Sequence, residues 1–288
     1  RYAFLHRSNR RFYLSNRVFL TWFHGDPQAP DMAPLFESLA PIAGEAEKIV
    51  VPCRLTLEPL LGLGLPAEKL VTIPLGVELG RFRPAVPMEK AEIRRELGLP
   101  DNAVLVGSFQ KDGSGWGEGM EAKPVKGPDV FLETIAAVAR KHPNIFVLLT
   151  GPARGFVKAG LEKIGVPYLH HMLDNYHEIV RYYQALDLYI ITSRCEGGPK
   201  ALLESWACGV PLVSTRVGMC ADLMVDGDNG VMVGQEDVEA LADGALRLIG
   251  DRSFRERVAN GGLKSITDFS WERIADRYMN ELYAPILG

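Results

Sequence analysis

Residues 185–211 read ALDLYIITSRCEGGPKALLESWACGVP. Their apolar beginning has the length and the residue types of a buried parallel strand. The Gly197-Gly198 pair then allows a tight turn, and Pro199 suits the first position of a helix, where its missing N–H costs nothing. We therefore expect a strand, a turn and a helix that ends near Cys208, as in an α/β protein with parallel sheets.

The predicted turn has the features of an anion-binding site. A helix that starts at the carboxyl end of a parallel strand directs free N–H groups and the positive end of its dipole into the crevice there, where a phosphate fits. Glu196 lies at the mouth of this site, and Glu204 lies roughly 7–8 Å beyond Pro199 along the helix axis. Carboxylates beside a phosphate suit a sugar, whose hydroxyls donate hydrogen bonds. The residues predicted to hold the phosphate are Gly197, Gly198, Pro199, Lys200 and Ala201.

A strand, a glycine turn and a helix also occur in α/β proteins that bind no phosphate, so the prediction of a phosphate site needs support from the neighbouring motifs. Glu196 and Glu204, followed by ACGVPLV at residues 207–213, resemble the E-x7-E signature of family 4 glycosyltransferases, which are retaining enzymes of GT-B fold. Upstream, residues 72–78 (TIPLGVE) are similar to the segment where such chains enter their donor domain. Downstream, residues 226–233 (DGDNGVMV) are similar to the family's next turn and strand.

The resemblance implies two Rossmann-like domains with parallel sheets and a nucleoside diphosphate sugar bound between them. It implies an acceptor-side domain in residues 1–80, a donor-binding domain in residues 81–268, and a C-terminal helix in residues 269–288 that crosses back to the first domain. A whole acceptor domain would carry several more βα units, so we expect a fragment or a reduced first domain. Its expected elements are helices over residues 33–43 and 54–61 and strands over residues 17–23, 48–51 and 69–73.

The resemblance also implies cations that bind the donor diphosphate. Lys126, at the start of a predicted helix, matches the second cation of the family pattern. The first is usually an arginine beside a glycine, but this chain has Gly107-Ser108 there, and the nearest cation is Lys111. These lysines and the helix N-terminus would supply countercharge to the departing diphosphate. Because no Asp-x-Asp motif stands out as a metal site, we expect no metal and no cofactor beyond the donor, with a UDP-sugar favoured over a GDP-sugar.

Further site residues are expected at the ends of other strands. The resemblance implies that His24 faces the donor sugar and that the nucleobase lies near Tyr168 and His171. Arg154 follows a buried strand at the same sheet edge and is a candidate contact for an anion. The glycine-rich residues 110–119 (QKDGSGWGEG) lack the G-x-G-x-x-G order, and we interpret them as a mobile flap over the donor.

Charge and cysteine content limit the partners. Residues 1–17 carry five arginines and no acidic residue, interleaved with aromatic side chains. Such a segment suits an anionic lipid surface or a lipid-phosphate acceptor, and the alternative is a solvated helix face. The net charge of −4 disfavours nucleic acid, and four cysteines without C-x-x-C spacing indicate a reducing cytoplasm. We therefore expect a cytoplasmic protein with a peripheral contact at the inner face of the membrane.

The expected activity is transfer of a glycosyl unit from a nucleoside diphosphate sugar to a glycan or lipid-linked acceptor, with retention of anomeric configuration. Glu196 would orient the sugar hydroxyls, and Glu204 would accept hydrogen bonds from the ribose. Two alternatives remain: a non-catalytic fragment that binds nucleotide sugars, and a nucleotide-sugar epimerase of the same fold.

Overall fold

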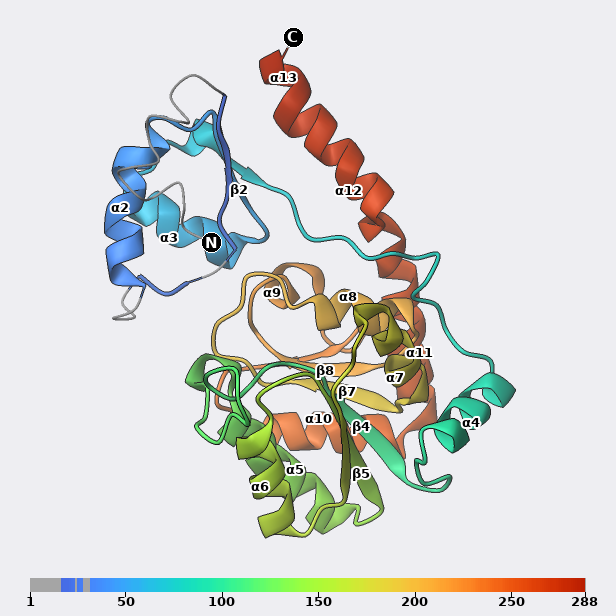
Figure 1. Cartoon of the computed structure of the whole chain (residues 1–288). Helices are drawn as coiled ribbons and strands as arrows, with labels where there is room; N and C mark the ends of the chain where they lie inside the picture. Colours follow the sequence, from blue (N-terminus) through green and yellow to red (C-terminus); the bar gives the residue numbers. More distant parts are fainter. Residues whose placement is uncertain (1–16, 24, 28–31, 288) are drawn as a thin grey trace.

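The computed structural model describes residues 17–23, 25–27 and 32–287. The chain forms two parallel sheets, each with helices against it, and a C-terminal helical segment that runs from the larger unit toward the smaller one (Figure 1). The predicted α/β fold with parallel sheets is confirmed.

The smaller sheet has the strand order β1-β2-β3, with all strands parallel. The predicted alternation of strands and helices is present, and each helix connects two parallel strands. The apolar sides of the helices and strands share one core, which includes Trp22, Leu39, Ile49 and Leu60. The elements are β1 (Phe19–Thr21), α2 (Ala33–Ala43), β2 (Lys48–Val51), α3 (Arg54–Gly62), η3 (Ala67–Lys69) and β3 (Leu70–Thr72).

The larger sheet has six parallel strands in the order β6-β5-β4-β7-β8-β9. In chain order this is 3-2-1-4-5-6, the order of a dinucleotide-binding Rossmann sheet. The chain continues from β4 to β5 on one side of the sheet and from β7 to β8 on the other side. Such folds bind ligands in the crevice beyond the carboxyl ends of the two strands where the direction changes, here β4 and β7. The strands are β4 (Val104–Ser108), β5 (Ile145–Thr150), β6 (Tyr168–His171), β7 (Leu188–Ile191), β8 (Leu212–Thr215) and β9 (Val231–Val233).

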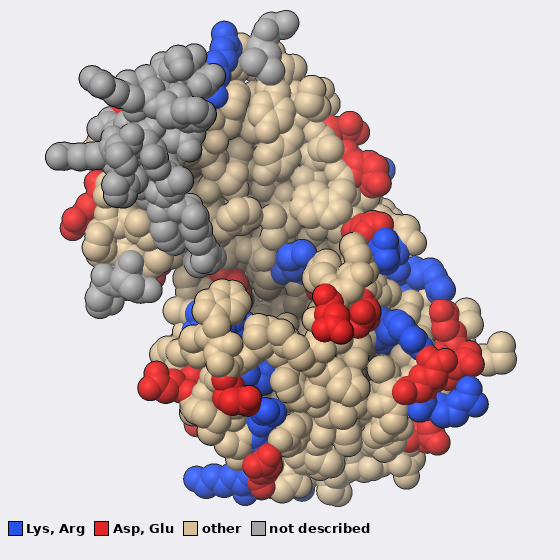
Figure 2. Space-filling view, in the orientation of Figure 1, with Lys and Arg blue, Asp and Glu red and all other residues tan. Residues whose placement is uncertain are grey.

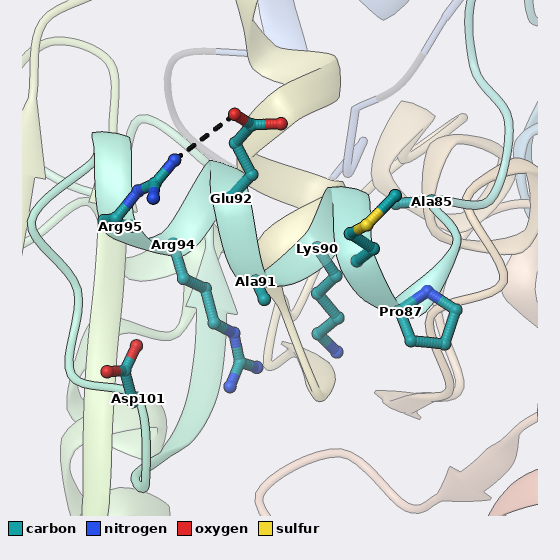
Figure 3. Close-up of a pocket in the computed structure, with 9 residues that line it drawn as sticks. Ala85, Pro87, Lys90, Ala91, Glu92, Arg94, Arg95 and Asp101 are labelled. Atoms are coloured by element: carbon teal, nitrogen blue, oxygen red, sulfur yellow. Dashed lines mark hydrogen bonds and ion pairs between the residues drawn. The ribbon is translucent and has the colours of Figure 1, made fainter.

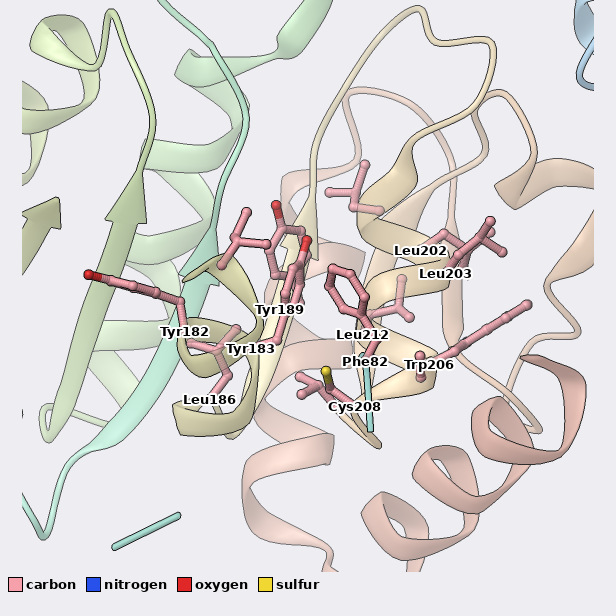
Figure 4. Packing of buried hydrophobic residues seen from close by; sticks show 14 of the residues in the cluster. Phe82, Tyr182, Tyr183, Leu186, Tyr189, Leu202, Leu203, Trp206, Cys208 and Leu212 are labelled. Carbon is pink, nitrogen blue, oxygen red and sulfur yellow. The ribbon is translucent and has the colours of Figure 1, made fainter. Parts of the chain in front are cut away.

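Alternate residues of the central strands enter two separate cores, because successive side chains of a strand point to opposite faces. Leu188 and Ile190 of β7 join the core under α5 (Pro128–Lys141), α6 (Gly155–Ile164), α10 (Val238–Gly250) and α11 (Arg252–Ser265). Tyr189 and Ile191 join the core under α7 (Ile179–Ala185) and α8 (Lys200–Ala207). Figure 4 shows this second core, where side chains of α7 and α8 surround Tyr189.

Helix α6 is not among the helices expected from the sequence. It begins at Gly155 and contains Gly160, and glycine is a poor helix former. Gly160 lies directly against the side chain of Leu132 on α5, where a Cβ would collide. Close packing of two helices therefore outweighs the low intrinsic propensity.

The C-terminal segment packs on the smaller sheet. It consists of α12 (Trp271–Arg277), the π-helical η7 (Tyr278–Tyr283) and α13 (Ala284–Leu287). Ile274 and Leu282 share a buried cluster with Val50 and Ile73 of the first unit. Arg277 Nη2 donates to the carbonyl of Thr72 at 2.8 Å.

Helix α4 (Pro87–Glu96) is attached to the outside of the larger unit. The side chains of Lys90 and Arg94 project from one side of α4, and that of Glu92 projects from the other (Figure 3). Arg94 Nη2 pairs with Asp187 Oδ2 at 2.7 Å, and Lys90 Nζ pairs with Asp187 Oδ1 at 2.8 Å. Burial works to raise the pKa of Asp187, but the two cations outweigh it and hold that pKa below its usual value. The remaining short elements are η4 (Pro124–Lys126), η5 (Tyr176–Glu178), α9 (Cys220–Leu223) and η6 (Ile266–Phe269).

Candidate active site

Two loops meet at the carboxyl ends of β4 and β7. The backbone N–H groups of Arg194 and Cys195, after β7, both donate to the carbonyl of Val125, at 3.0 and 3.2 Å. This contact joins the loop of Glu196 to the turn that carries Lys126. The surface is hollowed between the two units, with acidic and basic side chains beside the recess (Figure 2). The strand order thus places both segments at the ligand crevice of the fold.

Glu196 and Lys126 form an ion pair in this crevice. Lys126 Nζ contacts Glu196 Oε1, and Ser193 Oγ lies 3.0 Å from the same oxygen. The side chains are 10% exposed for Glu196 and 20% exposed for Lys126, so water screens the pair only partly. In the described part of the chain no donor is directed to Glu196 Oε2. Among the described residues the protein therefore holds one carboxylate oxygen, Oε1.

Gln110 and Ser193 support this pair and were not expected from the sequence. Gln110 Nε2 donates to the carbonyl of Lys126 at 3.0 Å, and Ser193 Oγ lies 3.1 Å from Gln110 Oε1. The single hydroxyl proton of Ser193 serves either Gln110 or Glu196 at one time. Both residues come directly after a central strand, β4 or β7, and that position is the signal that would have identified them.

Glu204 lies inside the crevice on the second turn of α8 and is 4% exposed. Tyr183 donates to Glu204 Oε2 at 2.8 Å, and the Tyr176 hydroxyl donates to Oε1. Lys200 Nζ lies 3.9 Å from Oε1. Burial and the neighbouring carboxylate raise the pKa of Tyr176 and of Tyr183, so both phenols stay protonated and act as donors.

The glycine turn before α8 is pressed against the first unit. A Cβ at Gly197 would collide with the carbonyl of Phe23, and one at Gly198 would lie 2.8 Å from Leu75 Cδ1. The carbonyl of Gly197 accepts from Met219 N at 2.9 Å. No side chain fits at this turn, which explains why two glycines stand there. Pro199 is the N-cap residue and forms no side-chain cap, so it leaves the first N–H groups of the helix, at Lys200 and Ala201, without a cap from its own side chain.

The glycine-rich loop is anchored rather than a free flap, which corrects the expectation from the sequence. Gly113 N donates to the carbonyl of Ala153 at 2.8 Å. A Cβ at Gly119 would lie 2.6 Å from the backbone of Ala153, and Gly119 has a φ of 69°. Only the tip is exposed: Trp116 is 85% accessible, and Lys111 Nζ lies 3.7 Å from its ring centroid. Lys111 therefore contacts an aromatic ring in this structure.

Arg154 anchors this loop and is not accessible to a ligand. Its side chain is fully buried, with Nη2 3.0 Å from Asp112 Oδ2. Nη1 donates to the carbonyls of Ser108 at 2.7 Å and Thr150 at 3.0 Å, at the ends of β4 and β5. Burial raises the pKa of Asp112 and lowers that of Arg154. The predicted anion contact is therefore replaced by an internal ion pair that joins two strand ends to the loop.

Three other residues that were expected to contact the donor belong to β4 and β6. Gly107 lies inside β4 against Leu186, where a Cβ would collide, so strand packing requires a glycine there. Tyr168 lies at the start of β6, far from the crevice edge, and donates to Glu162 at 2.7 Å. His171 ends the same strand, with Nδ1 2.7 Å from the Tyr182 hydroxyl. His24 and the basic residues 1–16 lie outside the described residues.

The two units are joined beside the crevice. Arg54 N, at the start of α3, donates to Asp222 Oδ2 at 2.6 Å, and Leu75 N lies 3.3 Å from Met219 Sδ. A carboxylate from the larger unit thus caps a helix of the smaller one, whose own N-cap, Cys53, forms no side-chain cap.

No three His, Cys, Asp or Glu side chains within the described residues are grouped closely enough to hold a metal ion. Within the same residues there is no helix with the length and apolarity that a membrane crossing requires. A pocket of about 840 Å³ beside α4, lined by residues such as Lys90 and Arg95, is separate from the crevice (Figure 3).

The chain is similar to several bacterial proteins. It is 28% identical over 256 residues to the D-inositol 3-phosphate glycosyltransferase of Saccharomonospora viridis, covering 83% of this chain and 56% of that protein. It is 28% identical over 210 residues to the lipopolysaccharide core biosynthesis mannosyltransferase LpsB of Rhizobium meliloti, covering 69% of this chain and 56% of that protein. The chain thus spans about half the length of the curated relatives it matches.

A solved structure supports the fold. The Anabaena protein Alr3699/HepE, in complex with UDP and glucose, superposes with a TM-score of 0.78 at 20% identity, covering 94% of this chain and 72% of that chain. This similarity confirms the GT-B arrangement.

A family model described as "Glycosyl transferases group 1" matches residues 121–265, half of the 288-residue chain. This segment includes Lys126, Glu196 and Glu204. The chain belongs to the group 1 glycosyltransferases.

Proposed function

We propose that the chain transfers a glycosyl unit from a nucleoside diphosphate sugar to an acceptor, with retention of anomeric configuration, as a family 4 enzyme with the E-x7-E pair Glu196 and Glu204. The observation that carries this proposal is the Lys126–Glu196 pair at the strand crossover, beside the uncapped start of α8.

Each group in the crevice suits one part of such a donor. The N–H groups at the start of α8 and the Lys126 ammonium suit the diphosphate, whose negative charge grows as it departs. Glu196 Oε2 suits the sugar hydroxyls and the positive charge of an oxocarbenium-like transition state. Glu204 suits the ribose hydroxyls, which would replace a tyrosine donor. No step in this scheme needs a metal ion or a second cofactor.

The comparisons support the substrate classes. One structural neighbour was solved with UDP and glucose, which favours a UDP-sugar donor over a GDP-sugar. The relatives act, by their names, on an inositol phosphate and a lipopolysaccharide core, which favours a glycan or lipid-linked acceptor. We place the reaction in the cytoplasm, at the inner face of the membrane, with residues 1–17 as the peripheral contact.

One experiment tests the proposal directly. A thermal-shift screen of nucleotide sugars would be followed by an assay of UDP release and glycosyl transfer with the donor that binds best. We expect one UDP-sugar to raise the melting temperature and to be turned over with an α- or β-linkage identical to that of the donor. Inversion of the linkage, or the absence of stabilisation by any nucleotide sugar, would contradict the proposal.

A second candidate function is binding of nucleotide sugars without turnover, which needs the diphosphate site at Lys126 and the start of α8 but no reaction at Glu196. Such a protein would be stabilised by a nucleotide sugar yet show neither hydrolysis nor transfer. An epimerase would instead interconvert donor sugars without an acceptor.

A further inference from the structure

Both oxygens of the Glu204 carboxylate are occupied by protein hydroxyls. Tyr183 donates to Oε2 at 2.8 Å, and Tyr176 donates to Oε1. Each oxygen keeps a second lone pair, but the Glu204 side chain is only 5% exposed, so a ribose diol reaches it by displacing one of the tyrosines that cover it.

The two tyrosines differ in their freedom to move. Tyr183 is 1% exposed, and its ring lies 4.9 Å from that of Phe109 and 5.5 Å from that of Tyr189 (Figure 4). Movement of this ring would disrupt a close-packed core. Tyr183 therefore serves as a fixed positioning residue that holds the carboxylate in one orientation.

Tyr176 is the exchangeable partner. It is 46% exposed and belongs to η5, a three-residue 3-10 turn in which no side chain is buried. Its ring lies 6.4 Å from that of Phe82 and 5.9 Å from that of His177, between centroids, and Lys200 Nζ covers it on one side at 4.1 Å. A rotation of this side chain toward solvent would cost little packing.

We propose that Tyr176 is an internal competitor of the ribose: its hydroxyl occupies Glu204 in the free protein and leaves when a ribose hydroxyl takes its place. This inference rests on the proposed function, because it takes Glu204 to be the residue that binds the ribose. It adds the partner that Glu204 has before the nucleotide binds. The exchange keeps a donor on the carboxylate in both states, so a nearly buried charge is never left unpaired. It also lowers nucleotide affinity, since one hydrogen bond is broken for each one formed.

The test compares Tyr176→Phe with the unaltered chain by titration calorimetry against UDP and 2′,3′-dideoxy-UDP. Phenylalanine keeps the ring under Lys200 and removes only the hydroxyl. We expect Tyr176→Phe to bind UDP roughly two- to tenfold more tightly, because binding no longer breaks the hydrogen bond between Tyr176 and Glu204. We expect a smaller change with 2′,3′-dideoxy-UDP, which lacks the competing hydroxyls. Tyr183→Phe, which removes the fixed donor, is expected to weaken UDP binding.

The outcomes separate this inference from the proposed function. Glu204→Gln is measured in parallel, and weaker UDP binding by this variant supports the ribose role of Glu204. If Glu204→Gln weakens UDP binding but Tyr176→Phe leaves it unchanged or weaker, the competitor role of Tyr176 is wrong and the ribose role stands. If Glu204→Gln and the loss of both ribose hydroxyls leave affinity unchanged, the ribose site itself is wrong.

Discussion

At the scale of single residues, the chemistry of the crevice depends on how Lys126 divides its charge. In the described structure it neutralises Glu196, which keeps a mostly buried carboxylate from standing alone. In the proposed donor complex, the same ammonium would interact both with the diphosphate, which it helps to bind, and with Glu196, which acts on the sugar. Binding and turnover can therefore be separated by substitutions at these two positions.

Glu196→Gln tests the catalytic half of this pair. The substitution keeps the shape and removes the negative charge that would stabilise an oxocarbenium-like sugar, so turnover should fall by about 10²–10³-fold. Free UDP does not need this charge and should bind as tightly as before or more tightly, because Lys126 is released. Donor turnover and UDP calorimetry measure the two effects. Normal turnover in this variant would remove Glu196 from the reaction.

Lys126→Met tests the binding half. Loss of the ammonium leaves Glu196 near the diphosphate without its counterion, so UDP affinity should fall by about 10-fold or more, as for a hydrogen bond between charged groups. Uridine has no phosphate, and its affinity should change little. Lys163→Met, at the exposed end of α6, is the matched control and should bind UDP normally. Equal losses for uridine and UDP would contradict a diphosphate contact.

Arg154 and Gly107 have contacts that the sequence did not predict, for one physical reason. Arg154 follows a strand at the ligand edge, and nothing in its neighbourhood in the sequence shows that Asp112 lies buried against it. Gly107 stands where a phosphate loop could begin, but its contact with Leu186 depends on tertiary packing. Strand position predicts which residues lie at the ligand-binding edge of the sheet, whereas the orientation of their side chains depends on partners far away in the chain.

At the scale of elements, local patterns were sufficient where hydrophobic periodicity and glycine or proline signals agreed. The expected bounds of α2 and β2 are those of the structure, and α8 differs from its expected range by one residue at each end. Helix α6 was missed because its Gly160 serves packing on Leu132 of α5 and its Gly155 lies against Glu118 and Met120. The anchoring of the loop over residues 110–119 was also missed, because it depends on backbone contacts with Ala153.

Asp187 fixes helix α4 to the strand β7 region and allows a prediction of pH dependence. The pKa of Asp187 is lowered in the folded protein, so its ion pairs with Lys90 and Arg94 stabilise the fold fully above the usual carboxyl pKa of about 3.9. This stabilisation is lost as the pH falls through the lower pKa that Asp187 has in the folded protein. Asp187→Asn should reduce the free energy of unfolding by about 1–2 kcal/mol at pH 7. Urea unfolding at several pH values measures this, and the difference from the unaltered chain should shrink in acid. A difference that is constant from pH 7 to pH 3 would contradict the account.

At the scale of the whole molecule, the crevice exists because two units are held together from two sides. Asp222 caps α3 beside the glycine turn, and the C-terminal segment packs Ile274 and Leu282 on the first sheet. The position of the first unit against Gly197 thus depends both on Asp222 beside the crevice and on residues of the C-terminal segment.

Leu282→Ala tests this clamp. The side chain is 1% exposed in a cluster with Val50 and Ile73, so its loss should cost about 2–5 kcal/mol, mainly in the smaller unit. Hydrogen exchange should show a larger loss of amide protection in β2 than in β7. Leu248→Ala, in α10 of the larger unit, is the contrasting variant and should reduce protection in β7. Equal loss in both strands after Leu282→Ala would show that the two units unfold as one.

The most direct measurement is a crystal structure of the chain with a bound UDP-sugar. The account predicts the diphosphate against Lys126 and the N-terminus of α8, the ribose on Glu204 and the sugar beside Glu196 Oε2. A donor bound at another place, or Glu196 and Glu204 both without contact to it, would contradict the central claim.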